Sequence, residues 1–431
     1  MRNVGFDLIA ERPLGEVSME SRCPVILDTT GKDVHAEGAH LREQGPIAQV
    51  ELPQGIRAWT VVGHDLAMKL LTDPRVSKNP RQHWDAYING EIRSDWPLAS
   101  WTAMDNMTTT YGADHTRLRR PVVKAFTPRR VRAMQPYIEK TVTKLLDDLA
   151  AVPPGEVVDL KRMFCYRLPA SIICDLFGIP EESRAAILRG GEMTTDSSIT
   201  PEEAEANVRD WTAQFQQLLE AKRQHPGDDL TTDLIASAEE DGEAGMTDNE
   251  LIGTLFVALG AGSETVMNLV THAVHKLLTH PDQRAMVEDG RASWDDVIEE
   301  TLRAESPINM LPLRFAVEDI ELEGVTIPKG DPILMGYAAI GRDPELHGAN
   351  AGEWDITRTD KDHLSFGYGT HFCFGAPLAR LEAQVALPAL FERFPGLSLA
   401  LDAEELQPQG TFIMNGWKTL PVRLLAPAEV R

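Results

Sequence analysis

Apolar side chains recur at helical spacing along most of this 431-residue chain. The spacing predicts helices over Asp65–Leu71, Val131–Leu149, Leu160–Leu176 and Glu202–Leu219. Short apolar runs bounded by glycine predict strands at Ala58–Val62, Ile320–Glu323, Val325–Ile327 and Ile333–Met335. We therefore predict a mainly α-helical fold with small β-sheets at one side.

A much longer helix is predicted between Thr247 and the His280-Pro281 pair. Thr247 and Glu250 form a capping-box pattern, and about 32 residues at 1.5 Å rise make a rod of roughly 48 Å. Residues 260–265, in its middle, read GAGSET. Each interior glycine costs about 1 kcal/mol relative to alanine, so the two glycines need a reason. They either pack against a neighbouring helix or let the helix lie over a flat cofactor, while Thr265 can bond to the Ala261 carbonyl and bend the helix.

A second notable helix begins just after Cys373, in the stretch FGYGTHFCFG (Phe366–Gly375). Pro377 stands in its first turn, where the missing N–H is harmless. The thiol therefore lies at a helix amino terminus, which lowers a thiol pKa, and the glycines allow a bulky group to approach the backbone. A soft anionic ligand in such a loop suits a haem iron. The alternative is a buried structural cysteine, which explains neither the glycines nor His371.

The stretch FGYGTHFCFGAPLAR resembles the haem-binding loop of the cytochrome P450 family, and the resemblance extends from about Gly55 to Val422. It implies one large triangular domain, residues 1–431, with haem b between the long central helix and the helix after the cysteine loop. It implies Cys373 as the axial thiolate ligand of the iron. Other residues beside the cofactor would be Phe366, Gly367, Gly375, Ala261 and Gly262.

The resemblance also assigns a catalytic pair. The sequence AGSET, residues 261–265, is similar to the family's Ala-Gly-x-Asp/Glu-Thr. Thr265 would then be the alcohol that stabilises bound dioxygen, and Glu264 the acid that relays protons to it. Cleavage of the O–O bond consumes protons in an otherwise dry pocket, so the chemistry requires such a pair.

The same resemblance implies residues that bind the haem propionates and a structural ion pair. The haem propionates would be bound by His115, Arg119, Arg314 and His371, although YGADH replaces the frequent Asp-Pro-Pro-x-His before the first of these. Glu300 and Arg303 share one helix face and resemble the family's structural Glu-x-x-Arg bridge. Glu353 stands where a basic third partner is common, so Arg358 or His363 is expected to substitute.

The charge balance limits the kinds of binding partner that the protein can have. Asp and Glu outnumber Lys and Arg by 66 to 42, and the net charge of −24 disfavours nucleic acid and anionic membrane. The run from His115 to Arg132 nevertheless carries seven basic and no acidic residues. It is either a solvated helix face or a docking surface for an acidic ferredoxin, with contacts from Arg117, Arg120, Lys124, Arg129, Arg130 and Arg132.

Other features exclude several classes of protein. The four cysteines have no metal-finger spacing, and no GxGxxG, Walker or GxSxG pattern occurs. The first 20 residues lack the pattern of a signal peptide or membrane anchor, so we expect a soluble, cytoplasmic protein.

The resulting prediction is a monooxygenase that inserts one atom of O2 into a C–H or C=C bond of an apolar substrate. Its electrons would come from NAD(P)H through a reductase and ferredoxin, and the substrate would be a steroid- or macrolide-sized natural product. Substrate contacts are predicted at Trp84, Trp96, Leu259, Ala261, Asn309, Met310 and Ile413, although the tryptophans could equally pack the Asn79–Asn106 loop. A peroxide-driven or oxidative-coupling enzyme and, more distantly, a haem-binding sensor remain alternatives.

Overall fold

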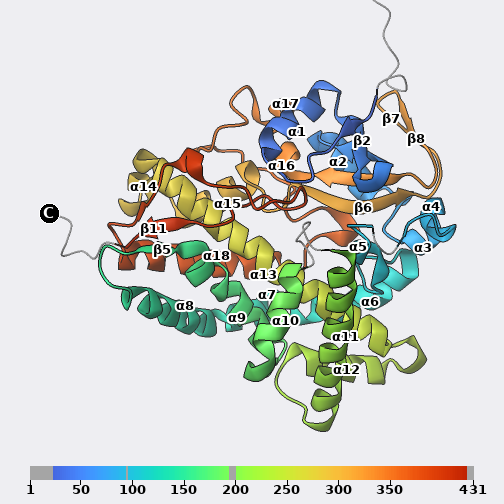
Figure 1. Cartoon of the computed structure of the whole chain (residues 1–431), viewed down its shortest axis with the longest axis horizontal. Coiled ribbons are helices and arrows are strands. Elements are labelled where there is room, and N and C mark those ends of the chain that lie inside the picture. The colour runs from blue at the N-terminus through green and yellow to red at the C-terminus, as the bar shows by residue number, and fades with distance from the viewer. Residues whose placement is uncertain (1–22, 94–95, 194–199, 425–431) are drawn as a thin grey trace, which may run out of the picture.

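The structure, a computed structural model, describes residues 23–93, 96–193 and 200–424. The first 20 residues, interpreted above, and residues 94–95 of the predicted Asn79–Asn106 loop lie outside the described residues. Helices dominate, and the molecule has a roughly triangular outline with its largest sheet at the upper right of Figure 1. The predicted mainly α-helical fold with smaller sheets is confirmed.

The helices of the described residues follow in chain order. They are α1 (Val34–Glu43), α2 (His64–Thr72), α3 (Pro80–His83), α4 (Asp85–Ile88), α5 (Ser100–Ala103), α6 (Gly112–Ala125), α7 (Pro128–Ala133), α8 (Gln135–Ala150), α9 (Arg167–Leu176), α10 (Glu181–Met193), α11 (Pro201–Gln224), α12 (Leu230–Glu240), α13 (Asp248–Thr279), α14 (Pro281–Glu288), α15 (Trp294–Ala304), α16 (Tyr337–Ile340), α17 (Pro344–His347) and α18 (Ala376–Arg393).

The strands are mostly short. They are β1 (Val25–Ile26), β2 (Ile47–Leu52), β3 (Ile56–Val61), β4 (Val76–Ser77), β5 (Val157–Asp159), β6 (Met310–Ala316), β7 (Ile320–Leu322), β8 (Val325–Ile327), β9 (Pro332–Gly336), β10 (Ser398–Leu399) and β11 (Pro421–Arg423).

Two predicted helices differ from the structure. The segment Val131–Leu149 was predicted as one helix but forms α7 and α8, which meet at Met134. Pro136 explains the break, because it lacks the N–H that a continuous helix would bond there and fits the first turn of a new one. In the predicted Leu160–Leu176 helix, Lys161–Cys165 is a π-helical turn that leads into α9.

The largest sheet joins segments that are distant in sequence, in the order β1-β2-β3-β9-β6-β4. The predicted strands overlap β3, β7, β8 and β9, whereas β1, β2, β4, β5, β6, β10 and β11 were not predicted. Pro312 obscured β6, since proline interrupts a strand ladder. The register of β6 against β9 shifts between Leu311 and Arg314, and Pro312 lies within this irregularity.

The long helix α13 is the central element of the helical region in Figure 1. Its start is confirmed, because the Thr247 side chain and the Glu250 side chain cap each other's backbone N–H groups. It packs against α9, α15 and α18. By length and composition alone α13 could cross a membrane, but 61% of its most apolar window is buried inside the protein, as in the core helix of a globular fold.

Candidate active site

A cavity of about 310 Å³ lies between α13 and the loop that leads into α18, and we call it the Cys373 cavity. Its walls come from the middle of α13, from β6 and the turn before it, from residues 101–109, and from residues 365–382. Trp101, Met104, Met107, Phe256, Leu311 and Met414 are among its apolar lining residues. The cavity therefore offers a mainly apolar space with a thiol on one wall.

The cysteine loop is held by its own backbone. Gly367 and Gly369 both have φ of +70°, and the Cys373 N–H donates to the Phe366 carbonyl at 2.8 Å. A Cβ on Gly369 would lie 2.7 Å from the Leu71 carbonyl oxygen, so α2 leaves no room for a side chain there. Both positions require glycine, which explains the glycine pattern around the cysteine.

Cys373 stands just before α18, as predicted, and the N–H groups of Gly375 and Ala376 donate to its sulfur. Burial nevertheless raises the pKa of the Cys373 thiol, and this outweighs the lowering by those N–H groups and by Arg119. The prediction of a lowered pKa is therefore wrong for the polypeptide by itself. The same N–H groups still favour an anionic sulfur once a metal ion displaces the proton.

The α13 wall carries the predicted hydroxyl and acid. Thr265 Oγ1 donates to the Ala261 carbonyl oxygen at 2.7 Å, which confirms the predicted hydrogen bond. Ala261, Glu264 and Thr265 all line the Cys373 cavity. Gly262 also lines it, but a Cβ there would meet Ile173 Cδ1 of α9 at 3.0 Å, so close helix packing is a second reason for this glycine.

Basic side chains gather at one end of the Cys373 cavity. His115 and His371 stack with ring centroids 4.0 Å apart, while Arg314, Arg119 and Lys78 line the same cavity. Burial lowers the pKa of His115 to about 4 and also lowers the pKa of His371, so both rings are neutral near pH 7.

Lys78 was not predicted from the sequence. Only 9% of it is exposed, and burial, with Arg314 nearby, lowers its pKa well below the usual value. Neither Lys78 nor Arg314 has an ion-pair partner among the residues that the structure describes. A buried lysine without an anion is costly, so this end of the cavity is suited to an anionic group. No hydrophobic periodicity marks Lys78, because it follows the two-residue strand β4.

Comparison with known proteins identifies the family. The family described as Cytochrome P450 matches residues 294–421. A 2-hydroxy-5-methyl-1-naphthoate 7-hydroxylase from Streptomyces carzinostaticus is 52% identical over 402 residues, covering 93% of this chain and 98% of that protein. The chain belongs to the cytochrome P450 family.

Further P450 relatives agree in sequence and in fold. The cytochrome P450 monooxygenase PikC from Streptomyces venezuelae is 37% identical over 93% of this chain and 94% of its own length. The solved structure of "Testerone bound CYP154C4" from Streptomyces sp. ATCC 11861 is 42% identical and matches with a TM-score of 0.91 over 94% of this chain and 99% of that one. The protein is a P450 monooxygenase with a haem-thiolate cofactor.

The residues present fit a haem. Within the described part of the chain, the buried Nε2 of His115 has no hydrogen-bond partner, and Lys78 and Arg314 have no anionic partner. Haem propionates would supply such acceptors and charges. Arg119, also predicted to contact a propionate, donates to the Phe372 carbonyl and so ties α6 to the cysteine loop. Phe366 lines the cavity and lies under the Arg380 guanidinium, 4.5 Å from it.

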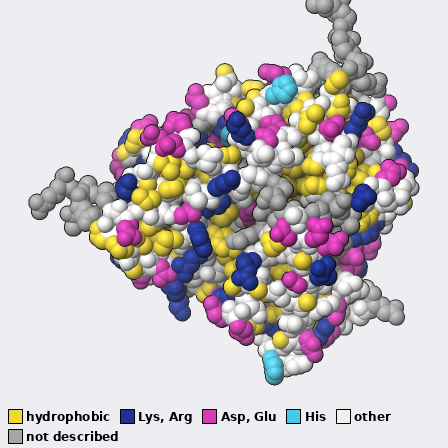
Figure 2. Space-filling model, in the orientation of Figure 1, with side chains coloured by type: hydrophobic (Ala, Val, Ile, Leu, Met, Phe, Trp, Pro, Cys, Tyr) yellow, Lys and Arg dark blue, Asp and Glu magenta, His cyan; other side chains and the backbone are white. Residues whose placement is uncertain are grey.

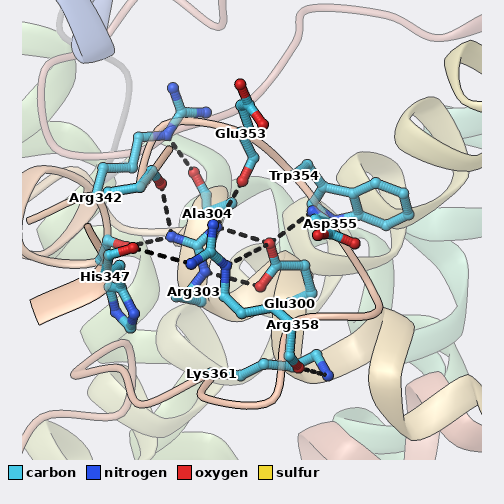
Figure 3. A network of polar contacts seen from close by, with 12 residues as sticks. Glu300, Arg303, Ala304, Arg342, His347, Glu353, Trp354, Asp355, Arg358 and Lys361 are labelled. Carbon is cyan, nitrogen blue, oxygen red and sulfur yellow. Dashed lines mark hydrogen bonds and ion pairs between the residues drawn. The ribbon is translucent and has the colours of Figure 1, made fainter. Parts of the chain in front are cut away.

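The predicted structural bridge is fully buried, and Figure 3 shows its polar contacts. Arg303 donates twice to Glu300, each at 2.7 Å, and its remaining N–H groups bond to backbone carbonyls that include that of Glu353. Arg358 is the third partner, with its Nε 3.8 Å from Glu300. His363, the other candidate, pairs with Glu299 instead.

Several of the predicted substrate contacts do not line the Cys373 cavity. Trp84 and Trp96 are each 2% exposed, and their rings pack against each other in a hydrophobic core. Trp96 also donates to the Pro53 carbonyl, and Trp84 stacks on Phe315. The buried residues Asn309, Met310 and Ile413 also lie outside the cavity lining.

The remaining two predicted contacts line different cavities. Leu259 lines a separate cavity on the other side of α13, and Ala261 lines the Cys373 cavity. Trp101, Thr102, Phe256, Ile308, Leu311 and Met414 also line the Cys373 cavity. Ile308, Leu311 and Met414 are sequence neighbours of the predicted Asn309, Met310 and Ile413.

Proposed function

We propose that this P450 uses haem b, bound through Cys373, to insert one oxygen atom of O2 into a C–H or C=C bond of an apolar natural product. The reaction takes two electrons from NAD(P)H through a reductase and ferredoxin, and two protons, and releases one water. One observation carries the proposal: a mainly apolar cavity has the Cys373 thiol on one wall and the Ala261–Thr265 segment of α13 on another. We place the enzyme in the cytoplasm, as one domain over residues 1–431.

Haem, when bound, supplies the iron that activates dioxygen. Lys78, Arg314, His115 and His371 would hold the propionates, which fixes the orientation of the ring in the cavity. The Thr265 hydroxyl donates a hydrogen bond to the Ala261 carbonyl oxygen, so its own oxygen keeps lone pairs that can accept from a proton-carrying water at the cavity wall. Glu264 is the acid that replaces the protons consumed there.

The substrate proposal rests on the large apolar side chains that line the Cys373 cavity. The rings of Trp101 and Phe256 and the methionines Met104, Met107 and Met414 offer broad apolar contact, and Thr102 adds a hydroxyl. We propose a fused-ring compound within the steroid-to-macrolide size range. Two relatives support the choice of a fused-ring compound, since one is named for a hydroxynaphthoate and the other for a bound "testerone". A screen for substrate-induced spin shifts, with fused-ring and macrolide compounds compared, tests it directly.

The catalytic assignment is tested with Thr265→Ala. We expect product formed per NAD(P)H to fall by about 100-fold, the scale of one lost proton-transfer contribution. Hydrogen peroxide should rescue turnover, because it already carries the reduced oxygen and its protons. Full activity of Thr265→Ala with O2 would contradict the assignment and favour the peroxide-driven or coupling alternative.

A ferredoxin docking surface is proposed on the side of the cysteine loop. Tyr368 and Phe372 of that loop are each 42% exposed, and Val123 of α6 is 41% exposed. Four exposed cations of the predicted run have no ion-pair partner among the described residues, and they are Arg120, Lys124, Arg129 and Arg132. An apolar centre beside a basic surface suits an acidic protein partner.

Two residues of the predicted docking run are engaged within the protein. Arg117 pairs with Glu250 at the start of α13, and Arg130 pairs with Asp233 of α12 at 2.7 Å. These pairs tie α6 and α7 to neighbouring helices. We therefore assign docking to the four unpaired cations and a structural contribution to Arg117 and Arg130.

A further inference from the structure

A second cavity, of about 770 Å³, lies on the other side of α13, and we call it the rear cavity. It is lined by charged groups from several elements, namely Asp159, Lys161, Arg162, Glu264 and Lys418. Arg162 and Lys418 are exposed, so the rear cavity reaches the surface. Its lining combines these charged groups with apolar side chains such as Ile187 and Trp211, and it is more polar than the lining of the Cys373 cavity, which suits water.

At Gly260 and Glu264, α13 forms the wall between the two cavities. Gly260 and Glu264 line both of them. Gly260 has no side chain to fill the wall, and the Glu264 carboxyl is the ionisable group there. A carboxyl that contacts a wet cavity on one side and the reaction space on the other is placed to carry protons between them.

The Glu264 carboxyl accepts a side-chain hydrogen bond from outside α13. Gln409 Nε2, from the loop between Leu406 and β11, donates to Glu264 Oε1. The Gln409 carbonyl oxygen accepts in turn from Asn268 Nδ2 at 3.3 Å and from Lys161 Nζ at 3.5 Å. Both ends of the Gln409 amide are therefore used, which fixes its orientation towards Glu264.

The backbone around Gln409 is fixed as well. The Gln409 N–H donates to the Gly416 carbonyl at 2.8 Å, within a short antiparallel pairing of Pro408 with Trp417. A Cβ on Gly416 would lie 2.6 Å from Gln409 Oε1 and 2.4 Å from Asn268 Oδ1. The absence of a side chain at Gly416 is what allows the two amides to meet.

We propose that Gln409 is a positioning residue that holds Glu264 in the wall between the two cavities, and that the rear cavity is the path by which protons reach Glu264. The inference rests on the proposed role of Glu264. Each turnover reduces one oxygen atom to water, with two electrons from the redox partner and two protons. In this scheme the protons pass from water in the rear cavity to the carboxyl, and from the carboxyl to the oxygen being reduced.

The test is Gln409→Leu, which keeps the size of the side chain and removes both hydrogen-bonding ends. We expect the product formed per NAD(P)H to fall about 10- to 100-fold, the effect of losing one hydrogen bond to a charged group, with more peroxide released. The solvent isotope effect on product formation should rise. Gln407→Leu, the same change at an exposed position outside both cavities, should match the wild type in each measurement.

A double-mutant cycle separates positioning from general damage. In a Glu264→Gln background, Gln409→Leu should cause no further loss, because its effect passes through Glu264. Infrared difference spectra give a second readout: a carboxyl band that disappears in Glu264→Gln should move in Gln409→Leu. Gly416→Ala, which displaces the two amide tips, should move the same band.

The outcomes distinguish this inference from the proposed function. If Glu264→Gln retains wild-type coupling of NAD(P)H to product, the role of Glu264 itself fails. If Glu264→Gln loses coupling but Gln409→Leu retains it, or if the two losses multiply, the positioning role of Gln409 is overturned.

Discussion

Lys78 brings an ammonium group into the cavity wall beside Arg314, and no carboxylate of the described residues pairs with it. The sequence predicted the other residues at this end of the cavity because they belong to motifs: His115 and Arg119 at i and i+4, and His371 two residues before Cys373. Lys78 belongs to no motif. It reaches the site because β4 pairs with β6, a contact between segments distant in sequence, and β6 was itself not predicted.

For Lys78 we predict a role in retaining the cofactor. Lys78→Met should speed the transfer of haem to apomyoglobin by about 10- to 100-fold, the effect of one lost charge-assisted hydrogen bond, while Lys78→Arg should stay near the wild-type rate. Lys69→Met, at an exposed lysine paired with Glu323, is the control. Equal transfer rates for wild type and Lys78→Met would show that no propionate contacts this lysine.

At the scale of elements, ion pairs hold α15 to the segment before α18 and to α18 itself, and the sequence predicted them only in part. The Glu300–Arg303 pair follows from its spacing on one helix face. The partners Arg358 and His363 come from the irregular segment between α17 and α18, which has no periodicity from which contacts could be derived. Arg380, the last residue of the FGYGTHFCFGAPLAR stretch, had no predicted role. In the structure its Nε donates to Glu299 at 2.6 Å.

The Glu299 pair predicts a pH dependence of stability. Burial raises the pKa of Glu299, but Arg380 and His363 outweigh it and lower the pKa to about 2. A lowered folded-state pKa contributes stability above the unfolded value near 4.5, and that stability is lost as the pH falls from about 5 to 2. Because Glu299 is 30% exposed, we expect only about 1–2 kcal/mol.

Urea unfolding of Glu299→Gln measures this contribution. The mutant should be less stable than the wild type at pH 7, and the difference should shrink steadily between pH 5 and pH 3. Glu288→Gln, which removes a more exposed carboxylate paired with Arg284, is the control. A difference between wild type and Glu299→Gln that stays constant with pH would mean that the Glu299 charge does not stabilise the fold.

At the scale of the whole molecule, charge is spread unevenly. Asp and Glu side chains are distributed over the entire face drawn in Figure 2, in keeping with the net charge of −24. The basic run on α6 and α7 is visible in the sequence alone. The sequence does not show which of these cations are unpaired. Glu250 and Asp233, the partners of Arg117 and Arg130, approach them only in the folded protein.

The docking proposal predicts an ionic-strength effect. Charge reversal in Arg120→Glu with Lys124→Glu should slow reduction by ferredoxin at low salt by at least about 10-fold, and should flatten its dependence on salt. Arg57→Glu, an exposed position on β3, should behave as the wild type. Unchanged salt dependence in the double variant would place the docking surface elsewhere.

The central claim is that the Cys373 sulfur is the axial ligand of a haem iron, and one spectrum tests it. The account predicts that the reduced, carbon monoxide-bound protein shows a Soret band with the red shift that a thiolate ligand causes, and that Cys373→His binds haem without this shift. A wild-type Soret band at the position typical of a histidine ligand would contradict the account.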